Sequence, residues 1–230
     1  MRLLFLIVTL LAASSASAIP LCTPGSLSNY LGLGPTGCTI GNTLYTDFGL
    51  LPSPPGATQV LPANIGITPL STPGHTGFEF GLNLNAGSGE LLEFLLAFNV
   101  SGAAIARNTI SLTGATAAGD GAVTLVEDKC LGGTFNPGSF IGCSGIPATL
   151  IAFAIEVDAE LLQQLVFAPT GLIGVVADIA VDGGPNGTAS LTSASVMFQA
   201  QTVPEPGTLL LIGGVLIGIG LSRGLRSVRP

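Results

Sequence analysis

The chain is poor in charge, and poorest in positive charge. Charged residues make up 8% of its 230 residues, and Lys and Arg together number only 6. An ordinary soluble domain carries about 25% charged residues. Because nucleic-acid binding relies on Lys and Arg to neutralise phosphates, this composition argues against a nucleic-acid-binding protein. With a single histidine and no Cys-x-x-Cys pair, the sequence also argues against a zinc site.

Apolar residues are plentiful by comparison. They make up 47% of the chain, whereas 33 Gly and 16 Pro amount to about 21% of it. That share lies below the roughly 25–30% that is typical of low-complexity disorder. The length suits one sizeable domain with further segments at its ends, at about 100–200 residues per domain. The composition therefore predicts a folded domain.

The first 18 residues have the organisation of a secretory signal peptide. Arg2 supplies a positive start, residues 3–13 form an apolar stretch, and Ala16 and Ala18 form an Ala-x-Ala cleavage site. We expect the export machinery to recognise residues 1–18 and cleavage to follow Ala18. The alternative is an uncleaved N-terminal anchor, for which the apolar stretch is short.

The other end of the chain combines three features in a fixed order. Pro204, Glu205 and Pro206 lie within residues 203–207, and an apolar run covers 208–221. As a helix, these 14 residues would reach about 21 Å, less than the roughly 30 Å of a hydrocarbon core. A basic tail, 222–230, should stay cytoplasmic under the positive-inside rule. Its arginines are Arg223, Arg226 and Arg229.

This order of motif, apolar helix and basic tail resembles the PEP-CTERM sorting domain of exported proteins of Gram-negative bacteria. The resemblance covers residues 203–230, although the arginines are spaced out rather than clustered. It implies transient anchoring in the inner membrane, then processing by a membrane transpeptidase called exosortase and release to the cell surface or beyond. It also implies a bacterium that makes extracellular polysaccharide. The alternative is a plain single-pass anchor.

The intervening residues carry the alternating pattern of half-buried β-strands. In residues 78–85, apolar side chains alternate with polar residues or glycine, as expected for a strand with one buried face. Two segments, 90–100 and 160–167, fit either a helix or a strand, and their surroundings favour strands. The other apolar alternations are Ile151, Phe153, Ile155 and Val157; Ile173, Val175, Ala177, Ile179 and Val181; and Ala194, Val196, Phe198 and Ala200.

Segments rich in Gly, Asn, Asp or Pro separate these runs and predict turns. They are residues 85–89, 113–121, 168–171 and 182–188. Short strands at this spacing, without helical crossovers, predict an all-β fold, an antiparallel β-sandwich or jelly-roll-like ectodomain. The chain thus divides into a signal peptide (1–18), an ectodomain (19–202) and a sorting segment (203–230).

Four cysteines follow the signal peptide, and an even number suggests disulfides in an oxidising compartment. Three connectivities are possible. Sequence proximity favours Cys22–Cys38 and Cys130–Cys143, each of which closes a loop of about 15 residues and could stabilise the fold by about 3 kcal/mol. Both loops are rich in glycine and would benefit from such a clamp.

Catalytic constellations are sparse. His75 is the one base available to a Ser-His-Asp triad, and it lies in a Pro- and Gly-rich stretch. No Gly-x-Ser-x-Gly nucleophile elbow occurs. Carboxylates could pair for glycoside hydrolysis, and we expect neither an enzyme nor a cofactor. The candidate pairs, each within three positions in the sequence, are Glu90 with Glu93, Glu127 with Asp128, and Glu156 with Asp158.

Between residues 19 and 203 the chain holds 12 acidic and 2 basic residues. Such a surface repels polyanions and suits neutral glycans or cations. Calcium could be held by Asp182 with Asn186, or by Glu127 with Asp128, but neither pair matches a calcium motif and no metal site is predicted. We expect a structural or adhesive protein of an exopolysaccharide or biofilm matrix. The alternative is a carbohydrate- or calcium-binding module, and a glycoside-active enzyme ranks below both.

Overall fold

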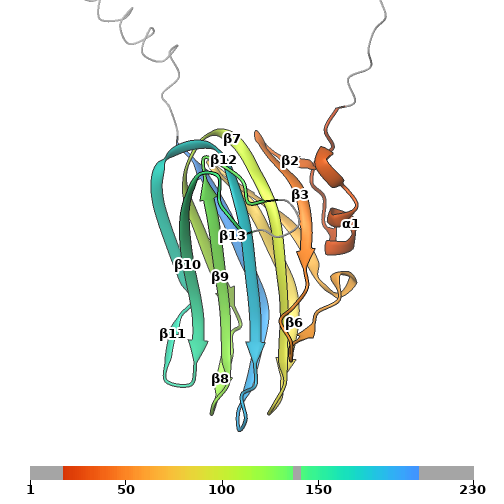
Figure 1. Cartoon of the computed structure of the whole chain (residues 1–230), viewed down its shortest axis with the longest axis vertical. Coiled ribbons are helices and arrows are strands. Elements are labelled where there is room, and N and C mark those ends of the chain that lie inside the picture. The colour runs from red at the N-terminus through yellow and green to blue at the C-terminus, as the bar shows by residue number, and fades with distance from the viewer. Residues whose placement is uncertain (1–17, 137–140, 202–230) are drawn as a thin grey trace, which may run out of the picture.

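The computed structural model describes residues 18–136 and 141–201, which fold into an almost wholly antiparallel sheet of 13 strands (Figure 1). The expected all-β class is confirmed. The strands are β1 Gly25–Ser26, β2 Cys38–Ile40, β3 Thr43–Leu51, β4 Thr58–Gln59, β5 Gly66–Thr72, β6 His75–Ala86, β7 Leu91–Thr113, β8 Thr116–Ala118, β9 Ala122–Leu131, β10 Ile146–Ile155, β11 Asp158–Glu160, β12 Leu162–Asp182 and β13 Thr188–Ala200. The helical turns are α1 Leu27–Leu31, η1 Gly34–Thr36 and η2 Pro62–Asn64.

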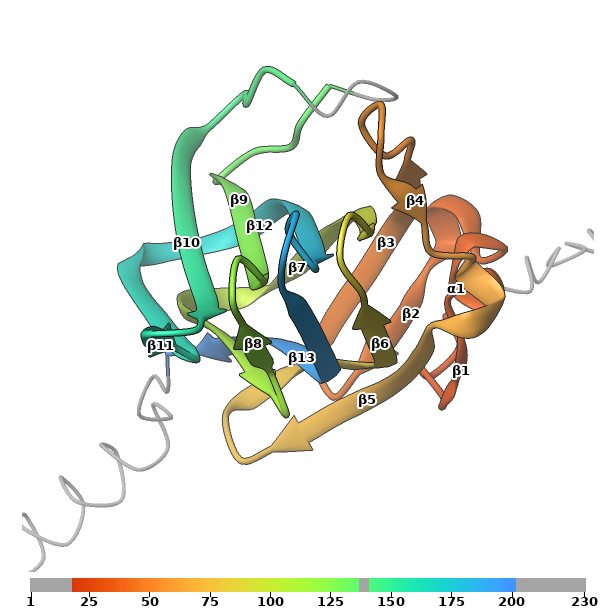
Figure 2. The ribbon, with the colours of Figure 1, turned by 90° about the horizontal axis from the view of Figure 1, so that it is seen from below.

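The sheet folds over on itself to form two layers, because β7 and β12 are long enough to belong to both. The first layer contains β3, the first half of β7, the second half of β12, and then β9, β10 and β11. The second layer contains β1, β5, β6, β13, the second half of β7 and the first half of β12. Figure 2 looks along the strands and shows the layers facing each other.

The predicted turn at 168–171 is wrong, because this segment is an irregularity inside β12. The register with β7 shifts between Val166 and Thr170 and again before Leu172, while pairing continues on both sides. Pro169 has no N–H to donate to the ladder, which explains the interruption. Opposite it, Ala104 of β7 has a positive φ of 52°. The two strands therefore bend together here and pass from one layer into the other.

The core lies between the layers and confirms most of the predicted alternation. The inward residues of β12 from Ile173 to Val181 are all buried, as are Phe78 and Phe80 of β6. Aromatic rings meet across the layers: the ring centroids of Tyr45 and Phe78 are 4.6 Å apart, at an angle of 66°. The ambiguous segments 90–100 and 160–167 belong almost entirely to strands. The predicted turn 113–121 contains a short strand, β8.

In β10 the structure buries the face opposite to the one that the isoleucines favour. Ala152 and Ala154 are buried, whereas Ile151 is 50% exposed and Val157, just beyond the strand, is 86% exposed. The cause is the register with β9, where Ala152 lies opposite the buried Leu125. Directly paired residues of neighbouring strands point to the same face of a sheet. The pairing with β9, and not the size of its own residues, therefore decides which face of β10 is buried.

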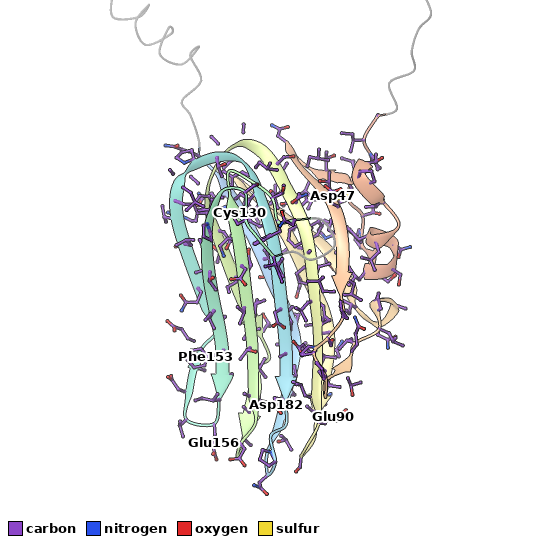
Figure 3. All side chains as sticks on the ribbon, in the orientation of Figure 1. Asp47, Glu90, Cys130, Phe153, Glu156 and Asp182 are labelled. Atoms are coloured by element: carbon purple, nitrogen blue, oxygen red, sulfur yellow. A yellow bond between two sulfur atoms is a disulfide. The ribbon has the colours of Figure 1, made fainter. Side chains whose placement is uncertain are left out.

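The described chain begins and ends at the same end of the sandwich, where β7 and β12 arch over (Figure 1). The Gln201 N–H donates a hydrogen bond of 2.7 Å to the carbonyl of Ala104 in this bend. The hairpins at the opposite end carry acidic residues, and Figure 3 labels Glu90, Glu156 and Asp182 there. A segment that follows Gln201 therefore leaves from the end remote from these hairpins.

Candidate functional site

Two disulfide-closed loops wall one cavity of about 570 Å³ beside the first layer. The bonds are Cys22–Cys38 and Cys130–Cys143, the pairs that sequence proximity favours. Gly34 and Pro35 of the first loop and Thr134 and Phe135 of the second line the cavity. Each bond restricts the conformations that its loop can adopt in the unfolded chain. The residues that line the cavity therefore come from loops whose ends are joined covalently.

A bulge in β3 supplies the polar edge of the cavity. The register with β7 shifts between Thr46 and Gly49, and Asp47 within the shift has a φ of 56°. Its carboxylate accepts hydrogen bonds of 2.9 Å from the Asn99 amide and from the Thr46 hydroxyl. Non-glycine residues with positive φ cost free energy and concentrate at functional positions. The bulge turns an acidic side chain toward the cavity instead of leaving it in the regular alternation of the strand.

The apolar wall opposite this edge depends on a glycine in β12. A Cβ atom at Gly174 would lie 2.9 Å from the Cα of Thr134 and 3.3 Å from the ring of Phe135. The absence of a side chain lets the second disulfide loop lie directly on the sheet, where the N–H of Gly174 donates to the carbonyl of Gly133 at 2.8 Å. Gly174 thereby places the half-buried Phe135 ring in the cavity wall.

The cavity combines a carboxylate, an amide and an aromatic ring without a nearby cation among its lining residues. Pockets of this size with apolar walls and a few converging polar groups are typical of small-ligand sites. A carboxylate and an amide together accept and donate hydrogen bonds. This combination suits a neutral polyhydroxylated ligand better than an anion.

The candidate pair Glu127 and Asp128 cannot share a calcium ion. They are neighbours in β9, where successive side chains point to opposite faces. Glu127 is fully buried in the core beside Lys129, 3.7 Å from its ammonium nitrogen. Asp128 lies on the outer face and accepts a hydrogen bond of 2.5 Å from the Thr149 hydroxyl. Strand alternation separates two residues that the sequence places side by side.

Asp182 and Asn186 sit in the β12–β13 connection, but their side chains have different partners. Asp182 accepts a hydrogen bond of 2.7 Å from the N–H of Gly184. Asn186 donates one of 3.1 Å to Asp120. Across residues 18–136 and 141–201, no group of three His, Cys, Asp or Glu side chains is arranged to hold a metal ion. The two side chains are therefore held by different neighbours.

The other candidate acids and the histidine lie apart from the cavity. Glu90 accepts a hydrogen bond of 3.2 Å from the N–H of Gly87 in the β6–β7 hairpin. Glu156 and Asp158 are exposed at the β10–β11 hairpin. His75 begins β6, and its Nδ1 lies 3.2 Å from the carbonyl of Pro73. None of these residues belongs to the cavity lining.

One carboxyl pair does form across strands, between Glu93 of β7 and Asp178 of β12. Both lie on the outer face of the first layer, and Glu93 is only 6% exposed. Burial, the charge of Asp178 and a hydrogen bond to Asp178 raise the pKa of Glu93 to about 7. Burial also raises the pKa of Asp178. Two carboxyl groups that lie close together share a proton more readily than they both ionise.

Stability should therefore fall as pH rises through the range in which Glu93 loses its proton. The folded pKa is about 7 and lies above the ordinary value of 4.5, so the folded state binds more protons between these values. This contribution is fully present below about pH 4.5 and is lost as pH rises through about 7. Glu93→Gln keeps a donor to Asp178 without an ionising group, and should flatten the slope and raise stability at pH 8.

Urea unfolding at a series of pH values measures this slope. Glu156→Gln, at the exposed hairpin, is the matched control and should behave like the unmodified protein. An unchanged slope in Glu93→Gln would show that the carboxyl pair does not control stability.

The cavity residues Asp47, Asn99 and Phe135 escaped prediction from the sequence. They lie on three different segments, and none of them belongs to a motif that predicts a binding site. The signals that could have found them are indirect: Asp47 and Gly49 interrupt a strand pattern, and Phe135 lies between two cysteines. Only the fold brings the three together.

Several predicted residues lie outside the part of the chain that the structure describes. They are Ala16 of the cleavage site, Pro204, Glu205 and Pro206 of the motif, and Arg223, Arg226 and Arg229 of the tail. Among residues 18–136 and 141–201, no helix has the length and apolar character needed to cross a membrane.

The C-terminal segment matches the family model of the PEP-CTERM protein-sorting motif over residues 202–224. The chain is therefore of the class of exported proteins that carry a sorting motif. It is a PEP-CTERM domain-containing protein. The two disulfides agree with export to an oxidising compartment. Comparison with curated proteins gave no match.

Two solved structures match this chain at low similarity. One is TmCBM61 in complex with beta-1,4-galactotriose, with 10% identity over 53% of this chain and 69% of the other, and a TM-score of 0.26. The second is the enzymatically active domain of bacteriophage CBA120 tailspike protein 4, with 12% identity over 74% of this chain and 21% of the other, and a TM-score of 0.25. Similarity at this level says nothing about ligands.

Proposed function

We propose that the ectodomain binds extracellular polysaccharide and thereby has an adhesive and structural role at the cell surface or in the matrix. The observation that supports it is the cavity between the two disulfide-closed loops, with Asp47 and Asn99 on one edge and Phe135 on the wall. A sugar ring presents hydroxyl groups around its edge and apolar C–H groups on its faces. The cavity offers hydrogen-bonding groups to the former and an aromatic face to the latter.

The charge of the ectodomain narrows the ligand class. With 12 acidic and 2 basic residues between positions 19 and 203, the surface repels polyanionic polymers. A neutral polysaccharide avoids this repulsion. The proposed role is binding rather than catalysis, because no acid in the cavity lining besides Asp47 is available for the paired carboxylates of glycoside hydrolysis.

The test is the affinity of the exported protein for neutral exopolysaccharide purified from the producing cells. Phe135→Ala should weaken binding by about tenfold or more, since a central aromatic contact contributes about 1.4 kcal/mol or more. Asn99→Ala should also weaken it, because a donor to sugar hydroxyls is lost. Phe153→Ala, at a half-buried position of β10 outside the cavity, is the matched control and should bind normally. Unchanged affinity in Phe135→Ala and Asn99→Ala would refute the proposed site.

We further propose that the protein is anchored in the inner membrane only transiently. The sorting segment begins just after Gln201, at the end of the sandwich remote from the acidic hairpins. Exosortase would process the segment from the membrane, and the folded ectodomain would then pass to the cell surface or the medium. A binding module released in this way can bind polysaccharide that lies outside the cell.

A further inference from the structure

Three polar side chains meet inside the otherwise apolar core, at a place the cavity does not use. Asn108 projects inward from the second half of β7, in the second layer, beside its cross-strand neighbour Phe198. Glu127 and Lys129 project inward from β9, in the first layer. All three residues are 0% exposed. The group therefore spans the space between the two layers.

Glu127 is the common neighbour of the other two. Its Oε1 lies 3.7 Å from the Lys129 nitrogen, which also donates a hydrogen bond of 3.3 Å to the Glu127 carbonyl. The Asn108 amide is close enough to favour the ionised form of Glu127. Full hydrogen-bond geometry is not reached, because both carboxyl oxygens of Glu127 and the Oδ1 of Asn108 have no partner. The Nδ2 of Asn108 donates to the carbonyl of Met197 at 3.3 Å.

As separate side chains, these groups are costly for the fold. Buried polar atoms are nearly always hydrogen-bonded, and a buried ion pair loses several kcal/mol of hydration per ion, which is recovered only with good geometry. Here three oxygen atoms are unsatisfied and the ion pair is long. A reaction that converts the Lys129 amine into a neutral amide would remove the buried positive charge, and so the need for a buried ion pair.

We propose that Lys129 and Asn108 join in an intramolecular isopeptide bond, with Glu127 as the acid–base group. The Lys129 nitrogen attacks Cγ of Asn108, and Glu127 donates a proton to the amide oxygen as the tetrahedral intermediate forms. Glu127 then carries a proton from the attacking nitrogen to Nδ2, which leaves as ammonia, and Glu127 takes back the proton from the oxygen as the C=O bond re-forms. One C–N bond forms, another C–N bond breaks, and Glu127 returns to its starting state. The step needs no oxidant or reductant.

The core environment suits each role. Burial lowers the pKa of Lys129 and raises the pKa of Glu127, so the pair tends toward a neutral amine and a protonated acid. A neutral lysine is the nucleophilic form, and a desolvated site is a known way of activating it. The fold holds the groups together, which replaces an encounter in solution, and an apolar surrounding excludes competing water.

The bond would tie the two layers of the sandwich together. It would connect β7 with β9 through the core, whereas the two disulfides join cysteines only 16 and 13 positions apart in the sequence. A permanent tie would keep an extracellular domain folded where no chaperone can rescue it. This role is independent of any ligand in the cavity.

Mass spectrometry of the exported protein, produced from the full chain, tests the proposal. After reduction of the disulfides, its mass should be lower than that of the processed sequence by one ammonia, about 17 Da. Trypsin gives a second readout, since Arg107 and Lys129 are the only basic residues between positions 19 and 203. An acylated Lys129 is not a trypsin site, so the denatured protein should be cut after Arg107 and resist cleavage after Lys129.

Variants assign the roles. Glu127→Gln should restore both the full mass and the cleavage after Lys129, while circular dichroism still reports the β fold. Asn108→Asp should cross-link with loss of water in place of ammonia, about 18 Da. A protein of full mass that is cut after Lys129 would overturn the proposal, whatever the variants do. So would a loss of ammonia with normal cleavage after Lys129, since the Asn186-Gly187 sequence can lose ammonia by cyclising.

Discussion

Replacing Phe78 with alanine should lower the free energy of unfolding by about 3–5 kcal/mol, the range found for large aromatic side chains removed from a core. Phe78 is fully buried in β6 and lies at the centre of the aromatic group between the layers. Its ring centroid is 4.6 Å from that of Tyr45, 5.5 Å from Tyr30 and 5.8 Å from Phe48. Tyr45 and Phe48 belong to the first layer, so the substitution opens a cavity where the layers meet.

Equilibrium unfolding in urea, with the disulfides intact, measures this loss. Phe153→Ala is the matched control, because it removes the same side chain from a half-buried position on the outer face of β10. We expect that control to cost about 1 kcal/mol or less. Equal losses in the two variants would mean that the aromatic group does not hold the layers together.

The sequence was sufficient to predict the class of fold, because alternation with a period of two is a direct consequence of one-sided burial. The run from Ile173 to Val181 and the run around Phe78 behave as that rule expects. The rule failed in β10, where the larger residues Ile151 and Ile155 face outward. Which face of a strand is buried depends on its neighbour, and the pairing of β10 with β9 is not readable from either segment alone.

The candidate site was less predictable than the fold, for a related reason. Sequence proximity favours the two disulfides, since each closes a short loop. It does not reveal that the two loops lie beside one cavity, because Pro35 and Phe135 are 100 positions apart. Sequence proximity suggests that Glu127 and Asp128 could act together. They are adjacent on one strand, however, so their side chains point to opposite faces of the sheet. Glu93 and Asp178 show the opposite case. They are far apart in the sequence, and the pairing of β7 with β12 brings their carboxyl groups together.

A single change in the C-terminal motif should have an all-or-none effect on whether the sorting segment is removed and the protein is released. Glu205 is the one charged residue between positions 203 and 222, so it is the feature of the motif that a processing enzyme can recognise by charge. Without recognition, the apolar run and the arginine tail should remain as a membrane anchor. We therefore expect Glu205→Ala to accumulate in the membrane with Arg229 still present, and to be missing from the medium.

Intact mass of the membrane and extracellular fractions distinguishes these states. The unmodified protein should appear outside the cell with its C-terminus near residues 203–207. Glu156→Ala is the matched control: it makes the same substitution at the exposed β10–β11 hairpin, at the opposite end of the sandwich from Gln201. It should be released normally. If Glu205→Ala is also released normally, the motif does not direct processing; if the unmodified protein retains Arg229 in the membrane, the segment is a permanent anchor and the ectodomain acts from the membrane surface.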